Sequence, residues 1–212
     1  KISNILSLTA NSSLDHIENV YHQALTSPSS RDVQDACIQK DIVRTYSSKR
    51  YFNDDKQKRG YEKLERLLRA VSSYKNIGYV QGMNFIAASV LWHCEEDIAY
   101  YVVRELFDKL QAQNNYTNNL SGVQLNVNTF YYSYLRVQER QIFECLELKG
   151  IMPLMVFPEW FVTLGTSNVP LQYHAHLIHM LIVHGWDYLY VVIKNYLVEL
   201  YDNYKDVEFG HA

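Results

Sequence analysis

The amino-acid sequence predicts an all-α protein without significant β-sheet, on three observations. Apolar residues recur with the 3.6-residue period of a helix along most of the chain. No segment alternates cleanly between apolar and polar residues, as a half-buried strand would. Only 8 glycines and 4 prolines occur among 212 residues, so few breaks between helices are expected. The length allows one large domain or two packed lobes, and no internal repeat is found.

Four helices are expected in the first half of the chain, over residues 32–44, 62–71, 80–92 and 97–110. The first ends in a loop that begins at Thr45. The second is the clearest amphipathic helix, because apolar residues follow at i, i+3, i+4 and i+7 from Leu64. The third is too long for a strand and largely apolar, which indicates a buried helix.

A polar segment at residues 111–122 is the strongest change of composition in the chain and predicts a loop. We therefore expect two helical lobes that divide here, residues 1–120 and 121–212. Together these lobes would form one domain.

Glycine and proline punctuate the helices expected in the second half. A long helix over residues 130–148 ends before Gly150, and Pro158 begins another helix. Gly185 then precedes a last helix over about 186–204.

Composition and charge exclude several classes of protein. Twenty Lys and Arg residues stand against 23 Asp and Glu, and a formal charge of −3 does not suggest a nucleic-acid binder. The three cysteines form no CxxC pair, which favours a reducing compartment. Residues 160–186 contain no acidic or basic side chain, but polar residues and four histidines interrupt them. A buried helical core is therefore expected there instead of a membrane span.

The first of two motifs places Asp41 and Arg44 three residues apart at the end of a helix, with Ile38 one turn earlier. Since residues at i and i+3 share a helix face, the carboxylate can hold the guanidinium in one orientation. The alternative is an ordinary surface ion pair, worth under ~1 kcal/mol.

The second motif, G-Y-V-Q-G-M-N at residues 78–84, leads into the predicted buried helix through two glycines. A helix N-terminus offers free N–H groups and the positive end of a dipole, which suit a phosphate. Gln81 can orient a water through its amide oxygen and offer its NH₂ group to an anionic oxygen. The alternative is a glutamine that caps the helix or satisfies buried backbone groups.

Taken together, these motifs resemble the paired signatures of the TBC domain, the GTPase-activating module for Rab GTPases. Ile38-x-x-Asp41-x-x-Arg44 is followed by Thr45, and Tyr79-x-Gln81 is followed by Gly-Met-Asn. Further along, residues 158–164, 169–171 and 185–186 look like the third signature region of that family and the segments beyond it. The resemblance covers about residues 38–200.

The resemblance implies a two-lobed, all-helical TBC-type domain that inserts two side chains into the nucleotide site of a small GTPase. Arg44 matches the arginine finger of the family, and Gln81 matches its glutamine finger, which positions the attacking water. Asp41 matches the carboxylate that supports the arginine. The remaining supporting residues are Ile38, Tyr79, Gly82 and Asn84.

The implied partner is a Rab-family GTPase in its GTP-bound form. GTP and Mg²⁺ belong to that partner, so the chain is expected to need no cofactor or metal of its own. It would be an activator without substrate turnover of its own, cytoplasmic, and active in vesicle trafficking. Contact with endomembranes would be indirect, through the Rab or flanking regions. The alternative is a catalytically inactive TBC-like module that binds a GTPase or complex partner as a scaffold.

Three departures from the family pattern stand out. Tyr46 and Ser47 follow Thr45 where the family usually has Phe-Pro, so a stiffening proline is lost and finger mobility is expected to differ. His-Leu-Ile-His at 176–179 replaces an Arg-x-Trp-Asp segment, and different packing is expected there. The opening segment of the family is not recognisable in residues 1–31.

A cluster of histidines raises a third hypothesis, a metal-dependent hydrolase. No HExxH string, partnered cysteine or nearby pair of carboxylates supports it, and histidines in cores or interfaces are commoner than metal ligands. The residues concerned are His174, His176, His179 and His184.

Overall fold

The computed structural model describes residues 13–26, 31–49, 51–52, 59–116 and 119–204. Within these residues all regular secondary structure is helical and no strand occurs, which confirms the all-α prediction. In chain order the α-helices are α2 (Leu14–Thr26), α3 (Arg31–Ile42), α4 (Arg59–Ser73), α5 (Met83–Leu91), α6 (Glu96–Leu110), α7 (Ser121–Asn128), α8 (Arg136–Gln138), α9 (Arg140–Leu148), α10 (Pro153–Val156), α11 (Pro158–Val162), α12 (His174–His184) and α13 (Trp186–Tyr204). Three short 3₁₀ segments, η1 (Tyr74–Asn76), η2 (Ala112–Tyr116) and η4 (Leu171–Tyr173), and one π-helix, η3 (Thr129–Leu135), complete the set.

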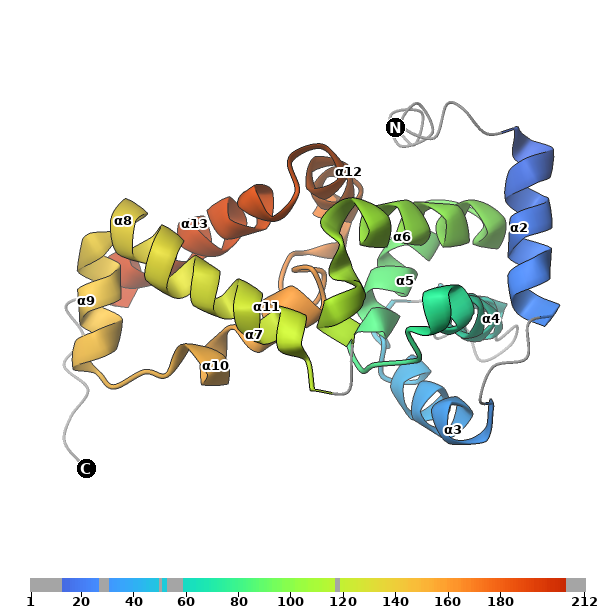
Figure 1. The fold of residues 1–212 in the computed structure, drawn as a ribbon, viewed down its shortest axis with the longest axis horizontal. Coiled ribbons are helices and arrows are strands. Elements are labelled where there is room, and N and C mark those ends of the chain that lie inside the picture. The colour runs from blue at the N-terminus through green and yellow to red at the C-terminus, as the bar shows by residue number, and fades with distance from the viewer. Residues whose placement is uncertain (1–12, 27–30, 50, 53–58, 117–118, 205–212) are drawn as a thin grey trace.

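The helices form an elongated arrangement with two ends (Figure 1). Helices α2 to α6 gather toward one end, and α8, α9 and α13 lie toward the other. Helices α7, α11 and α12 lie between them. No helix among the described residues has both the length and the apolar character required to cross a bilayer.

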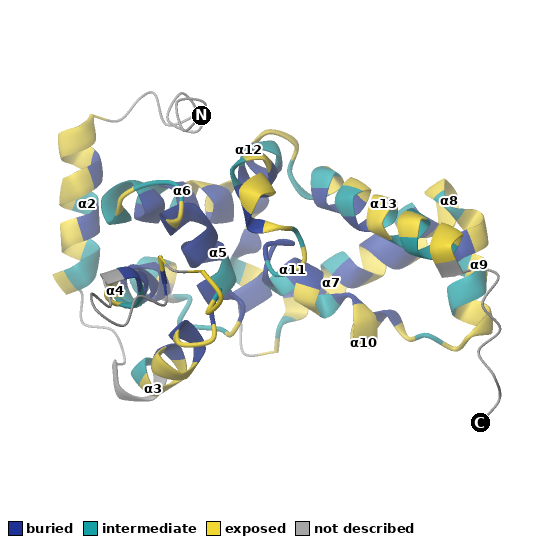
Figure 2. Ribbon diagram, turned by 180° about the vertical axis from the view of Figure 1, so that it is seen from behind, coloured by how far each residue is buried: buried dark blue, intermediate teal, exposed yellow. Residues whose placement is uncertain are grey.

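The first end is built around α5, whose residues are nearly all buried (Figure 2). The amphipathic helix predicted from Leu64 onward is α4; its leucine stripe is buried, and it packs against α5 and α6. Helix α5 begins at Met83, three residues after the predicted start, because Gly82 has a φ of +113° that no helix interior adopts.

The prediction of one long helix over residues 130–148 is wrong. Helix α7, η3 and α8 run on from one another, and the chain then breaks at Glu139, where φ is −140° and ψ is 66°. Helix α9 folds back, so that the Tyr131 ring meets the Phe143 ring at a centroid distance of 5.0 Å. The Tyr131 hydroxyl also donates to Glu147 Oε1 at 2.9 Å. The break occurs in a helical pattern that contains no glycine or proline, and it brings α9 into contact with η3.

The segment predicted as a loop, residues 111–122, contains η2 and the start of α7. Two of its side chains are buried because they bond to α11: Asn115 Nδ2 donates to the Phe161 carbonyl at 3.3 Å, and the Tyr116 hydroxyl to the Val162 carbonyl at 3.2 Å. The polar side chains of Asn115 and Tyr116 therefore serve a contact inside the protein and do not mark an exposed loop.

The second half of the chain reaches back to the first through α12, which packs against α5 and α6. Gly185, with φ +68°, then turns the chain into α13, as predicted. The division into lobes at residue 120 stays a prediction.

Candidate functional site

The end of α3 carries the first motif and is anchored by its apolar side chains. Ile38 and Ile42 are buried in the core, which turns the carboxylate of Asp41 inward, with a side chain only 5% exposed. Arg44 lies two residues beyond the end of α3, and its side chain is 56% exposed. Arg44 Nη2 donates to Asp41 Oδ1, so the pair expected from the spacing is formed. A buried carboxylate thus holds a guanidinium that faces solvent.

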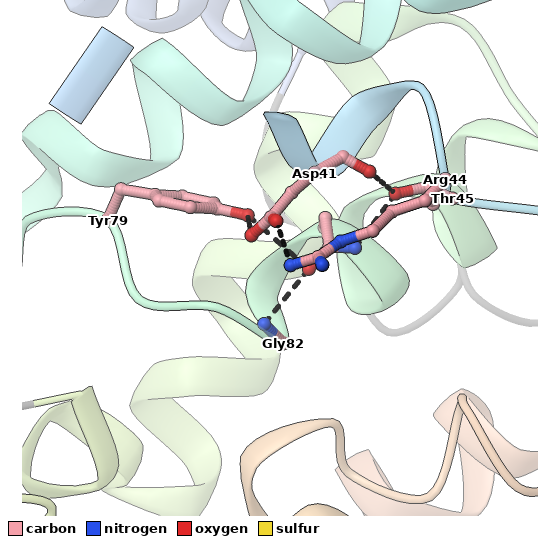
Figure 3. A network of polar contacts seen from close by, with 6 residues as sticks. Asp41, Arg44, Thr45, Tyr79 and Gly82 are labelled. Carbon is pink, nitrogen blue, oxygen red and sulfur yellow. Dashed lines mark hydrogen bonds and ion pairs between the residues drawn. The ribbon is translucent and has the colours of Figure 1, made fainter. Parts of the chain in front are cut away.

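Tyr79 uses the other oxygen of the same carboxylate. Its hydroxyl donates to Asp41 Oδ2 at 2.6 Å (Figure 3). Burial raises the pKa of Tyr79, and the hydrogen bond to Asp41 and the negative charge of that residue raise it further. The hydroxyl therefore stays protonated and remains a donor. The carboxylate is shared between the Arg44 side and the segment that carries the second motif.

Asn84, in the first turn of α5, links the two motifs through a series of hydrogen bonds. Its Oδ1 accepts the Gly82 N–H at 2.9 Å, and its Nδ2 donates to Thr45 Oγ1 at 2.8 Å. The Thr45 hydroxyl donates in turn to the Asp41 carbonyl at 2.6 Å. Asn84 and Thr45 are buried, so each bond satisfies a group that water cannot reach. The residue next to Arg44 is therefore joined directly to the start of α5.

Gly82 is required at its position for two reasons. Its φ of +113° lies in a region of backbone conformation that residues with a side chain rarely adopt. A Cβ atom there would also lie 2.2 Å from Val162 Cγ1, at the end of α11. The glycine lets the segment of the second motif lie directly against the second half of the chain.

Gln81 lies outside this network. Its side chain is exposed, and the N-cap position of α5 is taken by Gly82, which makes no side-chain cap bond. The alternative of a buried or capping glutamine therefore does not describe it. The amide is open to a partner, next to a backbone that Gly82 and Asn84 hold in place.

The structure brings six of the seven residues singled out by sequence into one connected arrangement. The seventh, Gln81, is exposed on the segment of the second motif, next to Gly82. Ile38 contributes by burial alone. Sequence reasoning missed the part played by Thr45. Its hydroxyl bonds to Asn84, 39 residues away, and no local spacing reveals such a contact.

The histidines of the metal hypothesis do not gather around a common point. His174 is buried and both ring nitrogens are in use: Nδ1 lies 2.8 Å from Ser89 Oγ, and Nε2 lies 2.6 Å from the Val169 carbonyl. Burial lowers the pKa of His174, which favours the neutral ring. In the part of the chain that the structure describes, no group of three or more His, Cys, Asp or Glu side chains could hold a metal ion.

Comparisons with known proteins agree on one family. The model of a family described as the Rab-GTPase-TBC domain matches residues 4–204. The chain is 26% identical over 186 residues to "Rab GTPase-activating protein eat-17" of Caenorhabditis elegans, covering 86% of this chain and 20% of that protein. It is 25% identical over 200 residues to "GTPase-activating protein GYP5" of Saccharomyces cerevisiae, covering 92% of this chain and 21% of that protein.

A solved structure shares the fold. The crystal structure of the Ypt/Rab-GAP domain of Gyp1p superposes with a TM-score of 0.69, covering 92% of this chain and 69% of that one. The sequence identity is 14%, so this likeness concerns the fold alone. The chain spans about a fifth of the length of the curated relatives named above.

Proposed function

The chain belongs to the Rab-GTPase-TBC domain family, and from that membership we propose that it accelerates GTP hydrolysis by a Rab-family GTPase in the GTP-bound form. The names of the relatives support this activity. Those names describe whole proteins, which are about five times longer than the part that matches this chain. One observation carries the proposal. A solvent-facing guanidinium is fixed by the buried carboxylate of Asp41, and a shared hydrogen-bond network joins it to the segment that presents Gln81.

Arg44 is the arginine finger in this scheme. Its exposed head group enters the nucleotide site of the GTPase and neutralises the charge that grows on the γ-phosphoryl oxygens in the transition state. The pair with Asp41 orients the planar guanidinium before the partner arrives, so that less side-chain entropy is lost on binding. Such a finger contributes ~10³–10⁵ in rate.

Gln81 supplies the second polar group. Its carboxamide accepts a hydrogen bond from the attacking water and donates to an oxygen of the phosphoryl group, two tasks that need no proton transfer. The GTPase brings GTP and Mg²⁺, and the chain itself contributes positioned side chains only. Membrane contact would then be made by the Rab.

The test is single-turnover GTP hydrolysis by a broad panel of Rab GTPases with the wild-type chain, Arg44→Ala and Gln81→Ala. Arg140→Ala and Gln23→Ala are matched controls, because both residues are exposed on helices away from the network. We expect acceleration of at least one Rab, a loss of ~10³-fold or more in Arg44→Ala, and a large loss in Gln81→Ala. Tight binding without acceleration by the wild-type chain would instead establish the scaffold alternative.

A further inference from the structure

Tyr46, two residues after Arg44, has a backbone conformation that needs support. Its φ is 45°, in the left-handed region where a bulky aromatic residue is uncommon. Such a strained conformation persists only where the surrounding structure fixes it. The turn that carries Arg44 is therefore held in shape by contacts made further along the chain.

The hydroxyl of Tyr46 makes those contacts. It donates to the Thr166 carbonyl at 2.7 Å, in the loop between α11 and η4, and lies 3.2 Å from Ser89 Oγ on α5. Thr166 is itself buried and its hydroxyl bonds to the Thr163 carbonyl at 2.6 Å, so the anchor point is rigid. The bond spans 120 residues of sequence and joins the Arg44 turn to the second half of the chain.

The ring of Tyr46 is packed independently of its hydroxyl. Its centroid lies 5.5 Å from that of Phe85, edge to face, 5.8 Å from His174 and 6.0 Å from Phe52. Phenylalanine would keep this packing and lose only the hydrogen bonds. Burial raises the pKa of Tyr46 to about 12, so the hydroxyl is a donor at every pH at which the protein would be studied.

The turn is thus fixed on both sides of Arg44. On one side, the Arg44 and Thr45 N–H groups bond to the Asp41 and Ile42 carbonyls at 3.2 Å. On the other side, the Lys49 N–H bonds to the Tyr46 carbonyl at 2.8 Å, and the side chain of Tyr46 is anchored at Thr166. Ser47, the next residue, is exposed and lacks the fixed φ of a proline. The bond from the Tyr46 hydroxyl to Thr166 restrains this turn, which has no proline at position 47.

We propose that Tyr46 is a positioning residue for Arg44: its hydroxyl, bonded to the Thr166 carbonyl, holds the guanidinium-bearing turn in the geometry that reaches the nucleotide. This inference rests on the proposed function, in which Arg44 is the finger. Tyr46 touches neither substrate nor partner in this role and acts through Arg44 alone.

The test compares Tyr46→Phe with Tyr116→Phe. Tyr116 is buried, and its hydroxyl also donates to a backbone carbonyl near α11, that of Val162 at 3.2 Å, so the two changes remove similar bonds. In single-turnover assays over a range of concentrations, we expect the maximal rate to fall about 10-fold in Tyr46→Phe, with the half-saturating concentration unchanged. Tyr116→Phe should leave both values within about twofold of wild type.

A double variant separates positioning from general damage. In an Arg44→Ala background, Tyr46→Phe should cause no further loss of the residual rate, because there is no guanidinium left to position. An equal loss in both backgrounds, or a maximal rate of Tyr46→Phe within twofold of wild type, overturns the proposal.

Amide hydrogen exchange gives a readout that needs no GTPase. Faster exchange at residues 44–49 is expected in Tyr46→Phe and not in Tyr116→Phe. Unchanged exchange in this segment would refute the anchoring role whatever the activity. Absence of acceleration by the wild-type chain, together with faster exchange in the variant, would count against the proposed function and leave the anchor standing.

Discussion

The turn that carries Arg44 and the segment that carries Gln81 differ in how far each side chain is oriented in the free chain. Arg44 has its side chain oriented in advance, because Asp41 binds the head group and Thr45 fixes the adjoining backbone. Gln81 has a fixed backbone, set by Gly82, and a side chain open to solvent. Fixing such a side chain when a partner binds costs up to ~2 kcal/mol of rotamer entropy. Under the proposed function, the cation would be prepared in the free domain, whereas the amide would be aligned by the bound GTPase.

The largest expected effect tests whether the orientation of the charge matters or only its presence. Arg44→Lys keeps the positive charge but lacks the planar guanidinium, in which Nη2 binds Asp41 and the other N–H groups would face a phosphoryl group. The single-turnover rate with the most responsive Rab should fall ~10²–10³-fold. Arg140→Lys, on the exposed face of α9, should change it by less than twofold. A rate within tenfold of wild type for Arg44→Lys would show that charge alone suffices.

Gly82→Ala would break the contact that supports the Gln81 segment. The variant combines a strained φ of +113° with a Cβ that overlaps Val162 Cγ1. We expect the free energy of unfolding to fall by about 3 kcal/mol in urea titrations. Gly150→Ala is the matched control, with φ +65° and open space around the new atom, and should cost about 1 kcal/mol. Similar losses in the two variants would mean that the approach to Val162 relaxes freely.

Asp41→Asn would leave the Arg44 side chain less well oriented in the free chain, as the Gln81 side chain already is. The amide is neutral and has one acceptor oxygen where the carboxylate has two, so the ion pair with Arg44 is lost and either Arg44 or Tyr79 loses its acceptor. The rate should fall ~10–100-fold, and adding Gln81→Ala should multiply that loss because the two side chains act separately.

The control for Asp41→Asn lies on the same helix. Asp35→Asn removes one of the two carboxylate partners of Arg69, at 3.0 Å, and should leave the rate unchanged. If Asp41→Asn behaved like Asp35→Asn, the Asp41 carboxylate would not be orienting the finger.

The smallest effect concerns the link between the two regions. Tyr79→Phe removes the donor to Asp41 Oδ2 but leaves the pair with Arg44 intact. The free energy of unfolding should fall by about 1 kcal/mol, and the rate by less than about fivefold. Tyr173→Phe, at an exposed position, should change neither. A rate loss as large as that of Asp41→Asn would place Tyr79 among the groups that set the Arg44 geometry.

The sequence predicted features that depend on short-range spacing, and it did not reveal contacts between residues far apart in the chain. The i, i+3 spacing of Asp41 and Arg44 and the glycine before α5 are visible in short strings of residues, and the structure forms both features. The bond from Tyr46 to Thr166 spans 120 residues and leaves no trace in local periodicity. The helix break at Glu139 likewise goes with a tertiary contact, that of Tyr131 with α9, which the helical period does not predict.

Because α12 packs on α5 and α6, the motifs of Arg44 and Gln81 depend on the second half of the chain, although both lie within the first 84 residues. A fragment cut at residue 120 would lose α12, the Thr166 carbonyl that anchors Tyr46, and the Val162 side chain against Gly82. Grafting the motifs onto another helical scaffold would therefore transfer the Arg44 and Gln81 side chains without the contacts that fix their geometry.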